Sequence, residues 1–247
     1  MLLNENSIAF FWIGDNTNIP QVLVDSIRLV MGNEINVVQL TNKSTNEVEG
    51  VNDIKRFDLS NRIMIARLEA YSQYVPKTKN TFFCDADSIF INKLKLPENN
   101  SYKIFLSPRQ KDFNMNHTYP EFYEEFVNKT AKEVMPFLFG AIAIEGNQQK
   151  FFKEILNISL HLPERFHRWY GDQYALKQYI DKGFDEFEKL NLEIYLNILK
   201  EPLTPSYLKE AFEKKVQLIT FKGPHSKTYL EQSLILLNFF YKKFNLL

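Results

Sequence analysis

The chain has 247 residues, of which 45% are hydrophobic, with 30 Lys and Arg against 30 Asp and Glu. This length can bury one large core, and the zero formal net charge gives no electrostatic footprint for nucleic acid. The single cysteine, Cys84, excludes an internal disulfide and is typical of a reducing cytoplasm. We expect no secretory signal and no transmembrane helix, and we see no repeat or linker, so residues 1–247 are predicted to form a single domain.

The N-terminal segment predicts a β-α-β unit. Residues 8–13 read as a buried strand, residues 20–31 as a helix that begins at a proline, and residues 35–40 as a second strand. In such α/β sheets ligands bind beyond the C-terminal ends of the strands. Trp12 and Gly14, at the end of the first strand, are therefore candidates for binding a nucleotide.

A polar segment, residues 41–53, is expected to be a loop, and Asp58 or Ser60 is expected to cap a helix that ends near residue 74. Four residues form its apolar stripe: Met64, Leu68, Tyr71 and Val75. Arg62 falls opposite this stripe and is expected in solvent. Arg67 lies closer to the stripe, so its guanidinium can either reach the rim of the sheet, where phosphates would sit, or extend into solvent.

Two carboxylates one residue apart interrupt an apolar run at residues 81–91. Side chains alternate between faces in an extended strand, so Asp85 and Asp87 are expected to point the same way. Two like charges at the end of a buried strand repel each other and lose hydration. A divalent cation cancels both costs, and paired oxygen ligands suit Mg or Mn. Asp85 and Asp87 are thus candidate metal ligands. The alternative is that the Asp-x-Asp spacing arises by chance and binds nothing.

The second half of the chain predicts further alternation of strands and helices. Strands are expected at residues 102–107, 137–144 and 216–221. Helices are expected at residues 120–134, after a cap at Asn147, through about residue 200, after residues 204–205 and at 229–247. A polar-aromatic cluster at residues 161–173 breaks this pattern. Within it, Asp172 can either cap a helix or act in chemistry.

Four residues mark a late glycine-containing loop: Lys222, Gly223, His225 and Lys227. Lysines that fold over a metal-bound diphosphate neutralise the charge that builds on a leaving group. Transfer of a sugar from a nucleotide diphosphate demands this, because the anomeric bond breaks toward an oxocarbenium-like state.

The C-terminal helix predicted at residues 229–247 has apolar residues on more than one face. One face carries Leu234, Leu237, Tyr241 and Phe244, whereas Leu236 and Phe240 lie off it. This helix either packs on its own domain or contacts a second copy or a membrane surface, for which Lys242 and Lys243 beside the aromatic residues are suited.

These landmarks resemble, in order, those of the GT-A-fold glycosyltransferases, most closely the retaining enzymes of glycosyltransferase family 8 and related bacterial sugar transferases. Residues 66–68 are similar to the family's Tyr-Arg-Leu helix and residues 82–87 to its Tyr-Leu-Asp-Ala-Asp strand. Residues 139–144, 171–173 and 221–227 are similar to its Asn-x-Gly strand, its Asp-Gln turn and its His-x-x-Gly-x-x-Lys-Pro-Trp loop. The resemblance implies a Rossmann-like mixed α/β sheet flanked by helices.

The resemblance also implies roles. Asp85 and Asp87 would bind Mn or Mg and the nucleotide, and Arg67, Lys227 and the late loop would approach the diphosphate. Asp172 and Gln173 would face donor sugar or acceptor. The expected donor is a nucleotide-diphosphate sugar and the acceptor a carbohydrate or lipid-linked glycan. The expected setting is surface polysaccharide synthesis in the cytoplasm, with a possible peripheral location at the inner face of the membrane.

The chain departs from the family pattern at three places. Thr220 stands where the late loop has histidine, so a histidine ligand would have to be His225 from a shifted register. Thr228 and Tyr229 replace the Pro-Trp pair, and the asparagine before the strand glycine is absent.

Other readings of the acidic pair stay open. A haloacid-dehalogenase-type phosphatase uses Asp-x-Asp as nucleophile and acid, but on its first strand. A sugar-nucleotide pyrophosphorylase shares the sheet, but its Gly-rich loop is missing after Trp12. A non-catalytic carbohydrate-binding domain does not require the pair. Among transferases, inversion needs a carboxylate base, for which Asp172 is the candidate, whereas retention needs none.

Overall fold

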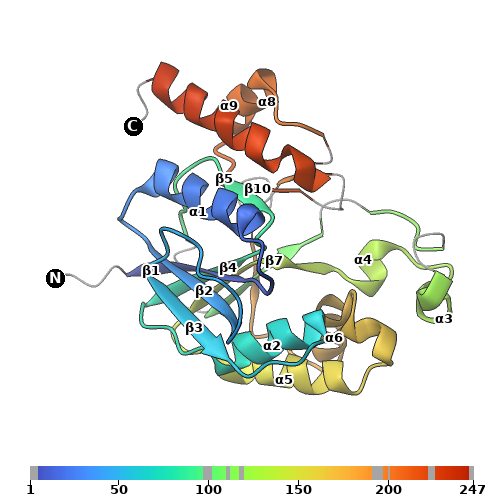
Figure 1. Cartoon of the computed structure of the whole chain (residues 1–247). Coiled ribbons are helices and arrows are strands. Elements are labelled where there is room, and N and C mark those ends of the chain that lie inside the picture. The colour runs from blue at the N-terminus through green and yellow to red at the C-terminus, as the bar shows by residue number, and fades with distance from the viewer. Residues whose placement is uncertain are drawn as a thin grey trace.

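The computed structural model describes residues 5–96, 102–109, 112–116, 120–190, 197–199, 201–221 and 226–244. Within them, a main sheet has seven strands in the order β3-β2-β1-β4-β7-β6-β8, and a small sheet has the order β5-β10-β9 (Figure 1). The main strands are β1 (Asn6–Phe11), β2 (Asn36–Asn42), β3 (Asp53–Phe57), β4 (Asn80–Cys84), β6 (Ile104–Pro108), β7 (Phe137–Glu145) and β8 (Glu188–Lys189). The small sheet consists of β5 (Ser88–Phe90), β9 (Asn197–Leu199) and β10 (Leu218–Phe221).

The main sheet is mixed, as predicted. β1 runs parallel to both β2 and β4, and β2 runs parallel to β3. β7 runs antiparallel to β4 and to β6. The predicted α/β class with a Rossmann-like beginning is therefore confirmed.

Helices cover both faces of the main sheet. They are α1 (Asn18–Met31), α2 (Ile63–Gln73), α3 (Tyr123–Phe126), α4 (Ala131–Val134), α5 (Gln149–Leu160), α6 (Gly171–Asp181), α8 (Pro205–Glu213) and α9 (Leu230–Lys243). In Figure 1, α1, α8 and α9 lie on one side of the sheet, and α2, α5 and α6 lie on the other. Among the helices that the structure describes, none combines the length and apolar character needed to span a membrane.

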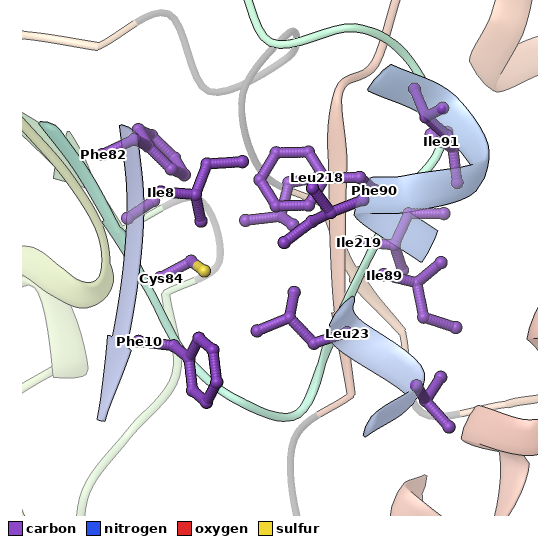
Figure 2. Packing of buried hydrophobic residues seen from close by; sticks show 14 of the residues in the cluster. Ile8, Phe10, Leu23, Phe82, Cys84, Ile89, Phe90, Ile91, Leu218 and Ile219 are labelled. Atoms are coloured by element: carbon purple, nitrogen blue, oxygen red, sulfur yellow. The ribbon is translucent and has the colours of Figure 1, made fainter. Parts of the chain in front are cut away.

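The two helical layers explain why the central strands β1, β4 and β7 contain apolar runs with no polar residue at alternate positions. Ile8 and Phe10 of β1 belong to the core under α1, whereas the alternating Ala9 and Phe11 belong to the core over α2. A strand buried on both faces cannot alternate with polar residues. Figure 2 shows the first core, in which Ile8 and Phe10 lie opposite Leu23 of α1.

The acidic segment is not one continuous strand, which corrects the prediction. β4 ends at Cys84, and β5 begins at Ser88 in the other sheet. Asp85 N still donates to Gly140 O of the main sheet at 3.3 Å, whereas Asp87 O accepts from Phe221 N of the small sheet at 3.0 Å. The two aspartates therefore lie in the link where the chain passes between sheets, and strand alternation does not set their directions.

Other local predictions were wrong. The predicted helix at residues 120–134 is divided into a 3-10 turn, α3 and α4, since Asn128 has φ +57° and Thr130 begins α4 with a capping box. Of the helices predicted through about residue 200, the described residues contain α6, whereas residues 188–189 and 197–199 form β8 and β9 rather than helix. β3, a polar edge strand, was not predicted. Neither Asp58 nor Ser60 is the N-cap of α2, because the helix begins at Ile63. Asn147 is not the N-cap of α5 either, since that position is Gln148, although Asn147 Oδ1 accepts from Gln149 N at 3.1 Å.

The C-terminal helix packs on its own domain along one face. Leu237 and Tyr241, two of the four residues predicted on that face, are buried, together with Leu230 and Ser233. Leu234 is half-buried, and Phe244 is exposed, as are Ile235 and Phe239 on the far face. Phe240 stacks on Phe212 of α8 with 5.0 Å between ring centroids. The predicted face is thus right at its centre only, and α9 also presents an apolar strip to solvent.

Removing the Tyr241 hydroxyl is expected to loosen α9. Tyr241 Oη donates to Ile91 O at 3.0 Å, and burial raises the pKa of Tyr241 to about 12 from 10.0. The neutral phenol therefore stabilises the fold fully below pH 10, and this contribution is lost as pH rises from 10 to about 12. Tyr241→Phe should lower the free energy of unfolding by about 1 kcal/mol and flatten this alkaline loss, measured by urea unfolding.

Phe239→Ala is the matched control, because Phe239 lies on the same helix and is 62% exposed. Its free energy of unfolding should change by less than about 0.5 kcal/mol. Equal losses in the two variants would contradict the docking of α9 through Tyr241.

Candidate active site

An arginine on α2 joins two carboxylates from different parts of the chain. Arg67 Nη1 donates to Asp85 Oδ1 at 2.9 Å, and Arg67 Nη2 forms an ion pair with Asp172 Oδ2. The Arg67 and Asp85 side chains are 14% and 13% exposed, and Asp172 is fully buried. A carboxylate without water is costly unless a cation pairs with it. Arg67 is therefore the cation that pairs with both of these aspartates.

Arg67 reaches the sheet, as one of its two predicted readings required. Its Cζ lies 5.3 Å from the centroid of the Phe139 ring of β7, in cation–π geometry. The predicted stripe of α2 is right for Leu68 and Tyr71 but wrong for Val75, which is exposed. Arg62 is not simply solvated either, because it bonds Glu164 Oε1 and His167 Nδ1, both at 2.7 Å.

The Asp85 carboxylate lies against the backbone of Gly140 on β7. A Cβ at this glycine would clash with Asp85 Oδ2 and would lie 2.9 Å from Asp85 Cγ. Real Cβ atoms essentially never approach side-chain carbon so closely. The strand glycine of the family resemblance is thus explained by space for Asp85, because any other residue would push the carboxylate away from Arg67.

Gly140→Ala is accordingly expected to weaken binding of nucleoside diphosphates at least about tenfold, and to cost about 1–3 kcal/mol of stability through overpacking. Calorimetric titration with UDP and GDP measures the first effect, and urea unfolding measures the second. Ala141→Gly, at the next position of the strand, should cost about 0.5–1 kcal/mol and leave binding unchanged. Tight binding in Gly140→Ala would show that Asp85 does not need this space.

Asp87 has its own cationic partner. Lys227 Nζ lies 3.1 Å from Asp87 Oδ2, with side chains 36% and 12% exposed, respectively. Thr220 Oγ1 lies 3.4 Å from Asp87 Oδ1, so the residue that replaces the family's histidine contacts this carboxylate. Arg67 therefore neutralises Asp85, and Lys227 neutralises Asp87. The sequence alone predicted instead that one divalent cation neutralises both aspartates.

The oxygen atoms of this site are of the type that binds a Mg or Mn ion, because hard cations accept carboxylate and hydroxyl oxygens such as those of Asp85, Asp87 and Thr220. Lys227 pairs with Asp87 in this structure. Within the described residues, no group of three or more His, Cys, Asp or Glu side chains comes together that could hold a metal ion. His225, the third predicted ligand, lies outside the described residues, as do Lys222 and Gly223.

The predicted Asp-Gln turn opens α6. Tyr170, in left-handed conformation at φ +63°, precedes the helix, and Asp172 is its second residue rather than its N-cap. Asp172 Oδ1 accepts from Gln173 N at 2.7 Å. Gln173 Oε1 accepts from Arg109 Nη2, also at 2.7 Å. Sequence reasoning missed Arg109, whose only signal was a charged residue directly after an apolar strand.

Trp12 and Gly14 lie in the loop after β1, at the C-terminal end of that strand as predicted. Trp12 Nε1 donates to Asn16 O at 3.1 Å, and Gly14 N donates to Thr45 Oγ1 at 3.0 Å. The structure thus brings Arg67, Asp85 and Asp172 into one cluster and Asp87 and Lys227 into a neighbouring pair. Trp12 and Gly14 are held by contacts within their own region of loops.

Comparison with protein-family models and with curated proteins gives no match. Among solved structures, the chain is similar to a glycosyltransferase involved in the glycosylation of the major capsid of PBCV-1. The TM-score is 0.57 at 10% identity, covering 93% of this chain and 98% of that one. For the galactosyltransferase LgtC in complex with donor and acceptor sugar analogs, the TM-score is 0.56 at 15% identity, covering 94% and 95%.

The bifunctional glycosyltransferase WbbM is similar at a TM-score of 0.56 and 15% identity, covering 96% of this chain and 50% of that one. Identities this low establish a shared fold and leave the activity to be argued from the site. The chain therefore has the GT-A fold of these glycosyltransferase structures.

Proposed function

We propose that this protein is a glycosyltransferase that moves a sugar from a nucleotide-diphosphate donor to a hydroxyl group of a glycan or lipid-linked glycan. The observation that carries the proposal is the pairing of Asp85 with Arg67 and of Asp87 with Lys227, directly after the central strand β4 of a GT-A fold. Basic side chains can bind the phosphate groups of a nucleotide diphosphate, and acidic side chains can bind the divalent cation that accompanies them.

The positive side chains supply what a departing diphosphate needs. Arg67 and Lys227 can each donate to phosphate oxygens, and a guanidinium does so in fixed fork geometry. A Mn or Mg ion, when bound, would be held by Asp85 and Asp87 and would neutralise charge on the leaving group. Lys222 and Gly223 are proposed to bind the same diphosphate and His225 to complete the metal ligands. Trp12 and Gly14 are proposed to face the nucleotide.

Retention of anomeric configuration is the stereochemistry that the surroundings of Asp172 support. A general base needs an accessible oxygen within reach of the acceptor hydroxyl. Asp172 is fully buried, one of its oxygens accepts from Gln173 N, and the other pairs with Arg67. In a retaining reaction, the departing diphosphate can take the acceptor proton. Proton NMR of the first-formed glycoside tests this: the donor's configuration is expected, and an inverted anomer would return Asp172 to the role of base.

The biological process and the compartment are proposed from the type of reaction and from the cysteine content. Assembly of a surface polysaccharide in the cytoplasm fits a nucleotide-sugar donor and a single buried cysteine. The exposed Ile235, Phe239 and Phe244, beside Lys242 and Lys243, are suited to contact a second copy or an anionic membrane surface. Phe239→Ser should weaken whichever contact forms, measured by analytical ultracentrifugation and by sedimentation with anionic vesicles. An unchanged result in both assays would remove this part of the proposal.

A thermal-shift panel of nucleoside diphosphates, with and without manganese, tests the function directly. A ligand that binds only the folded state raises the melting temperature, by several degrees at saturating concentration. We expect one diphosphate to do so, more strongly with manganese, and its base identifies the donor class. A shift with free sugars alone would favour a carbohydrate-binding domain. Hydrolysis of p-nitrophenyl phosphate with no nucleotide shift would favour the phosphatase alternative.

A further inference from the structure

Asp87 is held in place by the small sheet. Phe221 N of β10 donates to Asp87 O at 3.0 Å, and Thr220 Oγ1 donates to Asp87 Oδ1 at 3.4 Å. These contacts fix the backbone and one carboxylate oxygen of Asp87. The other oxygen, Oδ2, lies 3.1 Å from Lys227 Nζ. If this ion pair opens, we therefore expect the lysine to move and the aspartate to stay.

The two cations of the site differ in how firmly they are held. Arg67 is largely buried, pairs with two carboxylates and lies over the ring of Phe139. Lys227 is partly exposed and belongs to the 3-10 helix η3 (Ser226–Tyr229), which leads into α9. An ammonium on a flexible four-carbon stem also moves more freely than a planar guanidinium. Lys227 is thus the cation that can leave its aspartate, whereas Arg67 stays at Asp85.

Space for this movement lies beside the lysine. A surface cavity of about 190 Å³ is lined by residues of α1, η3 and α9, among them Lys227 itself and Glu231. A group the size of a water molecule needs only a small part of this volume. The Glu231 carboxylate lies four residues after Lys227 along the chain. Lys227 can therefore leave Asp87 and still have a negative charge nearby.

A divalent cation and the Lys227 ammonium are not compatible at the same carboxylate. Two positive groups a few ångströms apart repel each other, and water screens this repulsion poorly because the Asp87 side chain is largely buried. We propose, in an inference that rests on the proposed function, that Lys227 is an internal competitor of the divalent cation for Asp87. Lys227 covers Asp87 in the free protein and releases it when Mg or Mn binds.

The exchange couples the cation to the diphosphate. Once Lys227 has left Asp87, its ammonium can donate to a phosphate oxygen. A phosphate that attracts Lys227 conversely leaves Asp87 open to the cation. Such coupling between two ligands is reciprocal. The free protein should therefore bind manganese weakly by itself and more tightly together with a nucleoside diphosphate.

Titration with manganese alone, in the absence of nucleotide, isolates the competition. Free manganese is measured by electron paramagnetic resonance. Lys227→Met should bind manganese about threefold to tenfold more tightly than the unaltered protein, because it no longer holds a partly exposed ion pair against the cation. Lys227→Arg keeps the charge and should bind manganese as the unaltered protein does. In calorimetric titration, the factor by which manganese tightens binding of UDP or GDP should be smaller in Lys227→Met.

Two controls separate this contact from a general change of charge. Lys55→Met also removes a partly exposed lysine from an ion pair, with Asp53 at 2.8 Å on the edge strand β3, and should leave manganese binding unchanged. The double variant Lys227→Met/Asp87→Asn should bind manganese no more tightly than Asp87→Asn alone, because Lys227 acts through that carboxylate. Lys227→Gln removes the same charge and replaces Lys227→Met if that variant does not fold.

The outcomes separate the competition from the proposed function. Manganese binding that is equal or weaker in Lys227→Met, or a gain that persists when Asp87 is replaced, overturns the inference and leaves the proposed function intact. A melting temperature that no nucleoside diphosphate raises overturns the proposed function, even if Lys227→Met binds manganese more tightly.

Discussion

Asp87→Asn is expected to reduce sugar transfer at least about 100-fold, a loss comparable to removing one preorganised charge-stabilising group. The substitution keeps the shape of the side chain and removes the charge that pairs with Lys227 at 3.1 Å. Stability should change by less than about 1 kcal/mol, because Lys227 is partly exposed and such pairs are screened by water. Transfer is measured as nucleoside diphosphate released from a nucleotide sugar, and stability by urea unfolding.

Asp53→Asn is the matched control for this prediction. Asp53 also pairs with lysines, Lys55 at 2.8 Å and Lys77 at 3.0 Å, but it lies on the edge strand β3. Its transfer rate should equal that of the unaltered protein. Full transfer by Asp87→Asn would remove the acidic pair from the site.

The largest effect on stability is expected for Arg67→Met, about 3–5 kcal/mol, since it leaves a buried carboxylate without its cation. Asp172 is fully buried, so its neutral form would be favoured in this variant and its folded-state pKa would rise above the unfolded value. A raised carboxyl pKa means that stability is lost as pH rises through it. The variant should therefore be less destabilised at pH 5 than at pH 8 in urea unfolding.

The double variant Arg67→Met/Asp172→Asn is the control for this charge argument. It removes the fully buried one of the two carboxylates that lose their cation and leaves Asp85. It should therefore recover part of the loss and show a weaker dependence on pH between 5 and 8 than Arg67→Met. Equal destabilisation of the single and double variants at both pH values would mean that packing of Arg67 on Phe139, rather than charge, is what stabilises this region.

Much of the fold could be predicted because burial on both faces leaves a direct trace in sequence. The apolar runs of β1, β4 and β7 are long enough to be recognised locally. β3 and β8 escaped prediction because edge strands carry polar residues, and their pairing is decided by neighbours rather than by their own pattern. The break between β4 and β5 was also hidden, since the apolar residues on either side belong to two different sheets.

In the site, too, the residues that could be predicted are those marked by their neighbours in sequence, whereas contacts between distant parts of the chain could not be predicted. The sequence shows that Asp85 and Asp87 are two like charges next to an apolar strand, which predicts a bound metal ion. The structure adds that Arg67 and Lys227, which the resemblance places at the diphosphate, pair with these two aspartates. Asp172 was read as a helix cap or a base because only its neighbours were visible. Its partner on α2 and the Arg109–Gln173 bond depend on packing that no local pattern encodes.

The acidic pair is proposed to serve transfer from a nucleotide sugar, and release of nucleoside diphosphate measures this transfer. The assay compares the unaltered protein with Asp87→Asn and Asp53→Asn. Each is incubated with UDP-glucose, UDP-galactose, UDP-N-acetylglucosamine or GDP-mannose, once with manganese and once with a chelator, and the released diphosphate is quantified by chromatography. We expect release from at least one donor by the unaltered protein and by Asp53→Asn, and loss of release in Asp87→Asn. Release from no donor, or equal release by Asp87→Asn, would contradict it.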